Sequence, residues 1–255
     1  PRASNSIARP VLPGTRLAHL RMVIVCAARP TLFERRPYWG EGLAYHHCLK
    51  LQPLSKRDSR QLVLEILKHV EQVPPELREL VVEGAEGNPF YVEELVKMLV
   101  EDGVIVKGEQ SWQVHLDRLV KIEVPPTLAG VVQARLDSLS ADERTVLQQA
   151  SVVGRLFWDG VVAHIQAAEE RHENTLPEML TALRSRELIY RREESAFTNA
   201  REYIFKHDIL REVTYESVLK RLRKVYHGLV ADWLIAQGEE RAAEFSGLIA
   251  EHLHQ

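Results

Sequence analysis

The segment EYIFKHDILREV (202–213) places a histidine beside an aspartate, at the point where a strand-like alternation gives way to helical periodicity. The pair could be a helix cap, part of a catalytic site or a ligand sensor. No Gly-x-Ser-x-Gly or comparable nucleophile signal accompanies it, which argues against catalysis. Asp208 is suited to cap a helix over 209–219. A cap does not explain His207, whose imidazole N–H could donate to an anionic ligand and titrates near neutral pH.

Two other short segments have residues that could contact a nucleotide. Arg29 follows the apolar run MVIVCAA (22–28), and the C-terminal end of a buried strand is where α/β sheets bind ligands. A guanidinium there could contact a phosphate through two hydrogen bonds, although its position alone favours a solvated loop arginine. In GNPF (87–90), Pro89 and Phe90 could present a flat apolar surface to a nucleobase. Taken alone, the segment is better explained as a helix stop, an N-cap and an N1 proline.

Several kinds of site are missing from the sequence. It has no Gly-x-x-x-x-Gly-Lys-Ser/Thr phosphate loop and no apolar strand ending in Asp or Glu, so we expect no P-loop ATP hydrolysis from this chain alone. His46-His47-Cys48 and His252-x-His254 lack the spacing of a metal site. The net charge of −3 gives no general attraction to nucleic acid or to anionic membranes.

The two cysteines, Cys26 and Cys48, predict reduced thiols rather than a disulfide framework. The longest apolar run is too short to span a bilayer, and no signal peptide is visible. We therefore expect a cytoplasmic chain without a membrane partner. Its polar, proline-containing start without methionine indicates a piece of a longer protein.

The first half of the chain is expected to begin with two strands and continue with helices. Runs 22–28 and 48–55 are typical of short strands, here interpreted as the last strands of an α/β sheet. Helices are expected from Ser55, which forms a capping pair with Asp58, and over 74–87 and 88–103. Residues 104–116 alternate about a Lys-Gly-Glu turn and predict a hairpin.

The second half predicts three helices followed by a hairpin, the arrangement of a winged helix. The helices are expected over 124–139, 140–154 and 175–188, the last two with Ser140/Glu143 and Thr175/Glu178 as capping boxes. The hairpin covers 188–207. A DNA-binding regulator is the alternative function, but the approach to the presumed recognition helix (AAEERHENTLPE, 167–178) is mostly acidic, which disfavours phosphate binding.

Five segments, in this order, resemble the C-terminal part of the nucleotide switch of STAND ATPases: VIVCAARP (23–30), GNPFYVEEL (87–95), VPPTLAGVVQARLDSL (124–139), LQQASVVGRLFW (147–158) and FKHDILREV (205–213). The likeness is greatest to bacterial proteins that join this module to adenylate/guanylate cyclase domains and tetratricopeptide repeats. It extends over roughly residues 20–255.

The resemblance implies a role for three residues. Arg29 is similar to the sensor-1 arginine that responds to the γ-phosphate, and Pro89 to the Gly-x-Pro proline that packs against adenine. His207 is similar to the histidine of a Met-His-Asp motif, which contacts the β-phosphate of ADP in the closed state. Lys206 stands where that motif has methionine.

The resemblance also implies a mainly α fold in four parts: the remnant of a P-loop NTPase sheet (1–52), a helical lid (53–118), a winged helix (119–207) and the start of TPR-like helical repeats (208–255). ATP or ADP, with Mg²⁺ in the intact parent, is the implied cofactor. The implied partners are the adenine nucleotide, the missing N-terminal part of the same chain and a protein ligand of the repeats. Nucleic acid is not expected.

Overall fold

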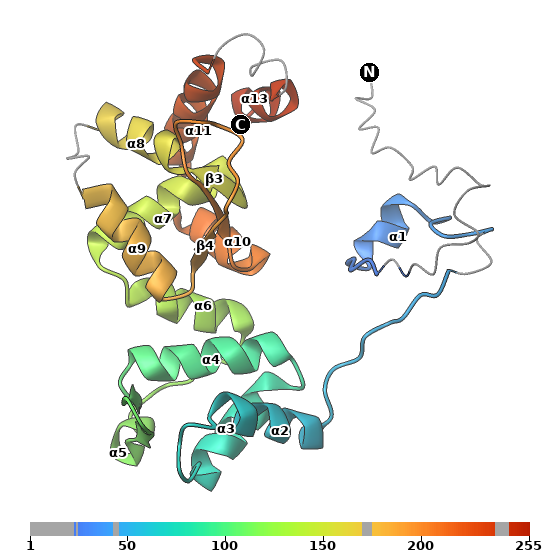
Figure 1. Ribbon diagram of the computed structural model, residues 1–255, viewed down its shortest axis with the longest axis vertical. Helices are drawn as coiled ribbons and strands as arrows, with labels where there is room; N and C mark the ends of the chain where they lie inside the picture. The colour runs from blue at the N-terminus through green and yellow to red at the C-terminus, as the bar shows by residue number, and fades with distance from the viewer. Residues whose placement is uncertain (1–22, 24, 43–45, 170–174, 238–244) are drawn as a thin grey trace. The chain divides into compact units, whose positions relative to one another are not determined.

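The computed structural model describes residues 23, 25–42, 46–169, 175–237 and 245–255. The chain divides into two units, 1–51 and 52–255, which are described separately below. The described residues are mainly helical, with two small antiparallel sheets (Figure 1).

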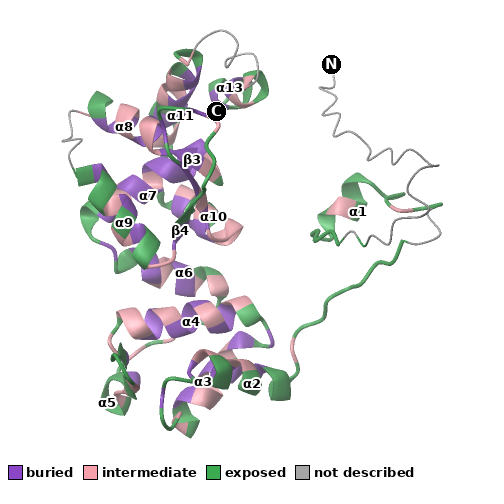
Figure 2. Ribbon diagram, viewed as in Figure 1, coloured by how far each residue is buried: buried purple, intermediate pink, exposed green. Residues whose placement is uncertain are grey.

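In the 1–51 unit, the described residues form one short helix, α1 (Thr31–Arg35). The predicted strands at 22–28 and 48–55 are wrong for the residues that the structure describes, none of which lies in a strand. Val25 and Leu51 are 88% and 87% exposed, and Figure 2 shows the segment that leads to α2 as almost wholly exposed. The physical reason is that a strand is stabilised by hydrogen bonds to a neighbour, and neither run has one within the described part of this unit.

The first part of the 52–255 unit contains four helices and a hairpin: α2 (Lys56–Ile66), α3 (Pro75–Ala85), α4 (Pro89–Glu101), β1 (Ile105–Lys107), β2 (Trp112–Val114) and α5 (Leu116–Leu119). The predicted helices and the hairpin over 104–116 are confirmed. The Ser55 hydroxyl accepts from the Asp58 amide, and the Asn88 side chain accepts from the amides of Phe90 and Tyr91. Pro89 occupies the first position of α4, as its fixed φ and missing N–H favour.

The second part begins with two helices and continues with a strand, two helices and two strands. These elements are α6 (Leu128–Asp137), α7 (Ala141–Val153), β3 (Leu156–Trp158), α8 (Asp159–Ala168), α9 (Leu176–Ser185), β4 (Ile189–Arg191) and β5 (Glu202–Phe205). The three strands form an antiparallel sheet in the order β3-β5-β4. The capping box of Ser140 and Glu143 is present at the start of α7.

Two local predictions in this part need correction. The strand β3 and the helix α8 between α7 and α9 were not predicted, because β3 has only three residues and pairs with a strand far along the chain. The capping box at Thr175 is also wrong: this residue has helical φ and ψ, and its side chain makes no cap hydrogen bond. A cap side chain is aimed at the free amides only when its backbone is extended.

The described residues after β5 form the helices α10 (Asp208–Ser217), α11 (Lys220–Ile235) and α13 (Ser246–Leu253). Both α10 and α11 pack against α7, and α11 also packs against α8 and α13 (Figure 1). Their apolar residues share one hydrophobic cluster with α7, α8 and the β3-β5-β4 sheet, whereas α2, α3 and α4 enclose a second cluster. Within the described residues, no helix has the length and apolar character needed to cross a bilayer.

Candidate functional site

The 52–255 unit brings the GNPF segment, which contains Pro89, against His207. The ring of Phe90, next to Pro89 at the start of α4, lies against the ring of His207, with centroids 3.8 Å apart and planes at 46°. Pro89 itself is exposed. Arg29 belongs to the 1–51 unit, where it is exposed immediately before Pro30, the N-cap of α1. The structure therefore joins the GNPF and KHD segments.

His207 is held at the junction between β5 and α10. It is the N-cap residue of α10, with an extended backbone (φ −137°, ψ 148°), and its side chain makes no cap hydrogen bond. Its Nε2 atom is buried and has no hydrogen-bond partner among the described residues. Burial lowers the pKa of the imidazole. The charge of Glu94 raises this pKa, and the charge of Lys206 lowers it. A neutral imidazole with one unsatisfied nitrogen is the result.

The predicted cap by Asp208 is wrong. Asp208 is the first residue of α10 itself, and its carboxylate pairs with the Arg155 guanidinium at 2.9 Å. The extended backbone that a cap requires is found one residue earlier, at His207. Asp208 nevertheless places negative charge in the first turn, where the helix dipole favours it.

Lys206, next to His207 in the chain, links α4 to the turn before β4. Its ammonium group pairs with Glu93 of α4 and with Glu187, at 2.8 Å, in the turn before β4. Lys97, one turn after Glu93 on α4, contacts Glu93 at 2.8 Å and Glu187 at 2.9 Å. Two lysines and two carboxylates thus bridge α4, the turn before β4 and the junction between β5 and α10.

A second group of charges lies deeper in the same interface. Arg135 of α6 is 1% exposed and pairs with Glu94, which is 0% exposed, and with Glu101 at 2.8 Å, both on α4. Its guanidinium also donates to the Arg186 carbonyl at 2.7 Å, at the end of α9. One arginine therefore connects α4, α6 and α9. We call Glu93, Glu94, Lys97, Glu101, Arg135, Glu187 and Lys206 together the interface cluster.

The electrostatics of the interface cluster favour its charged forms. Hydrogen bonds from Lys206 and Lys97 lower the pKa of Glu187 to about 2. Burial disfavours the charge on Lys206, but hydrogen bonds to Glu187 and Glu93 outweigh it and raise the pKa of this lysine. Burial similarly opposes the charge on Arg135, and the hydrogen bond to Glu101 and the field of Glu94 raise its pKa. These groups remain charged over the physiological pH range.

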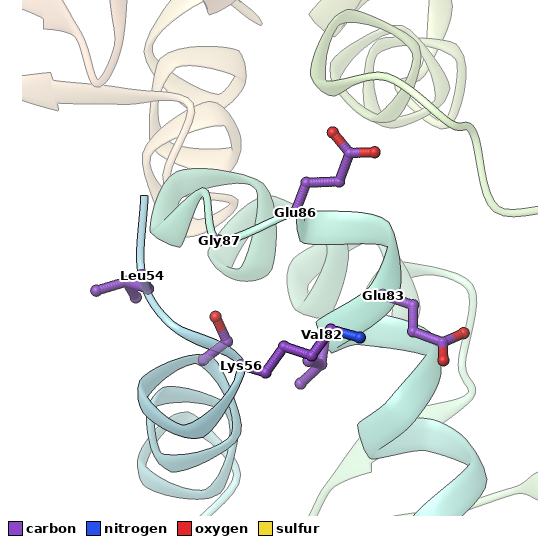
Figure 3. Close-up of a pocket in the computed structure, with 7 residues that line it drawn as sticks. Leu54, Lys56, Val82, Glu83, Glu86 and Gly87 are labelled. Carbon is purple, nitrogen blue, oxygen red and sulfur yellow. The ribbon is translucent and has the colours of Figure 1, made fainter. Parts of the chain in front are cut away.

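A groove of about 410 Å³ lies between the start of α2 and the end of α3, beside the GNPF segment (Figure 3). Lys56 reaches across it from the start of α2 toward Val82 on α3, and Gly87 closes one end. Gly87 has φ +80°, and a Cβ there would approach the Leu54 carbonyl oxygen to 2.4 Å, so the turn requires glycine. The groove is lined by Leu54, Lys56, Ser59, Val82, Glu83, Glu86 and Gly87.

Basic residues of the winged-helix alternative are engaged within the protein. The Arg186 side chain lies 3.6 Å from Glu143 and donates to Ser138, and Arg192 pairs with Glu202 at 2.5 Å. Arg184 is exposed on α9. These pairings reduce the positive charge that a phosphate backbone would meet.

Sequence reasoning identified His207 but missed the interface cluster. The spacing of Glu93 and Lys97 is a readable i, i+4 pair on a helix. Nothing local connects either residue to Glu187 or Lys206, because these contacts join segments far apart in the chain. Arg135 follows apolar residues on α6 and gives no sign that it is buried.

Comparison with known proteins adds little beyond these contacts. A family model described as a domain of unknown function (DUF8739) matches residues 55–108, which include α2, α3, α4 and β1. No curated protein matches the chain. In the part of the chain that the structure describes, no group of three or more His, Cys, Asp or Glu side chains is arranged to hold a metal ion.

Proposed function

We propose that this chain is part of an ADP/ATP-dependent STAND-type switch in which Arg29, Pro89 and His207 contact an adenine nucleotide. The observation that carries the proposal is the contact between Phe90 and His207. It places the GNPF and KHD segments side by side, as expected if one ligand touches both.

The state of His207 fits the proposed ligand. Its buried Nε2 has no partner among the described groups, so an anionic oxygen would satisfy a nitrogen that is otherwise costly to bury. A bound nucleotide would supply phosphate charge there. The residues of this chain would orient it: Phe90 fixes the imidazole plane, and Lys206 is held next to it by Glu93 and Glu187.

The order of elements supports the winged-helix part of the proposal. A helix, a strand, two helices and a hairpin follow one another from α7 to β5, and the first strand pairs with the last in the order β3-β5-β4. The origin of residues 1–52 as the end of a P-loop nucleotide-binding domain, the regulated output (a nucleotide cyclase) and the repeats after 208 rest on the sequence resemblance alone and are proposed on that basis. The cytoplasmic location is proposed from the two cysteines, which are free.

In this switch, ADP would favour the arrangement in which the lid and the winged helix remain together, and exchange for ATP would shift the population toward an open form. Such a shift requires that the two nucleotides contact His207 and Arg29 differently. The interface cluster supplies the closed contacts that an open form would lose.

The test uses this chain together with the coding sequence upstream of Pro1, where the proposal requires a phosphate loop and an acidic-ended strand. In that protein, ADP affinity is measured by calorimetry for the parent, His207→Ala and, as a matched control, His254→Ala, whose imidazole is exposed. We expect about a tenfold loss for His207→Ala, as for a hydrogen bond to a charged group, and no change for the control. Absence of an upstream phosphate loop, or equal ADP affinity in all three proteins, would overturn the proposal.

A further inference from the structure

Two buried histidines face each other between the C-terminal helices. His227 on α11 and His252 on α13 are each 5% exposed, and their Nδ1 atoms lie 2.6 Å apart. The rings have centroids 4.9 Å apart. The other nitrogen of His227 lies 3.0 Å from the Tyr215 hydroxyl of α10. We call His227 and His252 the histidine pair.

The hydrogen-bond geometry restricts the number of protons that the pair can hold. At 2.6 Å, one Nδ1 must donate and the other accept, so at most one of the two carries a hydrogen. Both histidines therefore cannot be imidazolium ions while α13 is docked. The Nε2 atom of His252 is also buried, with no hydrogen-bond partner among the described residues.

Positive charges near the pair disfavour protonation of His227. Two guanidinium groups flank the Tyr215 ring: Arg211 at 4.7 Å and Arg223 at 4.5 Å from its centroid. Glu251, on α13 itself, is the acidic group that acts on His252, while α7 contributes the neutral Val153 carbonyl. Glu169, at the end of α8, accepts from the Tyr226 hydroxyl at 2.7 Å. The charged groups that act on His227 are therefore mainly positive.

We infer that the histidine pair is a pH-sensitive contact that holds α13 on α11 near neutral pH and releases it on acidification. The inference is independent of the proposed nucleotide site. Helix α13 has only eight residues and packs chiefly against α11, so its docking depends on this one contact surface. Its release would uncover the aromatic group formed by Trp158, Phe197 and Phe245, whose last member precedes α13.

The sign of the pH effect follows from burial. Burial and the neighbouring His252, Arg211 and Arg223 lower the pKa of His227 to about 4, from 6.5 in the unfolded chain. Burial also lowers the pKa of His252. Below pH 6.5, His227 takes up a proton more readily when α13 is released than when it is docked. The docked state is therefore fully stable above pH 6.5 and becomes less stable as the pH falls toward 4. For His227 alone, the released population rises about 30-fold between pH 7.5 and pH 5.

The test is hydrogen exchange of the full chain at pH 7.5 and pH 5, expressed as protection factors to remove the intrinsic pH dependence of exchange. In the parent, protection of α13 should fall about 30-fold or more at pH 5, while protection of α4 is kept. The double variant His227→Gln/His252→Asn retains polar groups but cannot titrate, and its α13 protection should not change with pH. His254→Asn, an exposed neighbour, should behave as the parent.

Three results would overturn the inference: α13 protection in the parent that does not depend on pH, a double variant with the parent's pH dependence, or a His254→Asn variant that abolishes it. If the double variant does not dock α13 at pH 7.5, NMR titration of the parent decides. His227 should then titrate well below 6.5, and titration of both histidines near 6.5 would contradict the inference.

Discussion

Arg135 and Glu94 are buried as charged groups, whereas His227 and His252, almost equally buried, face each other as neutral rings. In the interface cluster every buried charge has an opposite charge within hydrogen-bonding distance. The histidine pair has no such partner and lies near two arginines. Burial alone therefore does not determine how a polar cluster responds to pH; the sign of the neighbouring charges does.

This difference assigns separate sensitivities to the two regions. Helix α4 and the β4–β5 hairpin are joined by groups that include Glu187, whose pKa is lowered to about 2, and Lys206, whose pKa is raised. The attachment of α13 depends on the histidine pair, in which the pKa of His227 is lowered to about 4. Mild acid should loosen the C-terminal end and leave the interface cluster intact.

The largest effect is expected from Arg135→Met. The substitution leaves the Glu94 carboxylate buried without its arginine, and breaking a buried pair in this way costs about 3–5 kcal/mol. The free energy of unfolding, measured by urea titration, should fall by that amount. Arg144→Met is the matched control, because the Arg144 side chain is partly exposed and lies 3.7 Å from Asp137 in a surface pair worth ~0–1 kcal/mol. Equal losses in the two variants would show that the interface cluster is not a buried charge network.

A smaller effect is expected from Lys206→Met, which places methionine where the STAND motif has it. Glu93 and Glu187 lose one cation but keep Lys97, so we expect a loss of about 1–2 kcal/mol in the free energy of unfolding. Lys68→Met provides the control: Lys68 is exposed and pairs with Glu65, three residues earlier in the chain. If Lys206→Met is as stable as Lys68→Met, Lys206 does not stabilise the contact between α4 and the β4–β5 hairpin.

The sequence predicted those parts of the fold that depend on local chemistry. Ser55, Asn88 and Ser140 identified helix starts because a cap involves amides only two or three residues away. The strand β3 was missed because its partner, β5, is more than forty residues along the chain. The apolar run at 22–28 was assigned as a strand from composition, which cannot show whether a pairing neighbour exists.

The candidate site was predictable to a similar extent. His207 was identified because a cap did not account for it, and Pro89 because its segment resembled a known motif. The positions of Lys206 and Arg135 against α4 could not be read from periodicity, since they depend on how distant elements pack. Asp208 was predicted one position out of place: the extended residue that precedes α10 is the histidine.

The most direct test of the central claim is NMR observation of the His207 imidazole in the protein extended upstream of Pro1, with ADP and then ATP added. His207→Ala assigns the resonance, and His254 serves as an internal reference. The account predicts that ADP shifts the Nε2 signal of His207, that ATP shifts it differently, and that His254 is unaffected. A His207 signal that is unchanged by saturating ADP would contradict the claim that this histidine contacts the nucleotide.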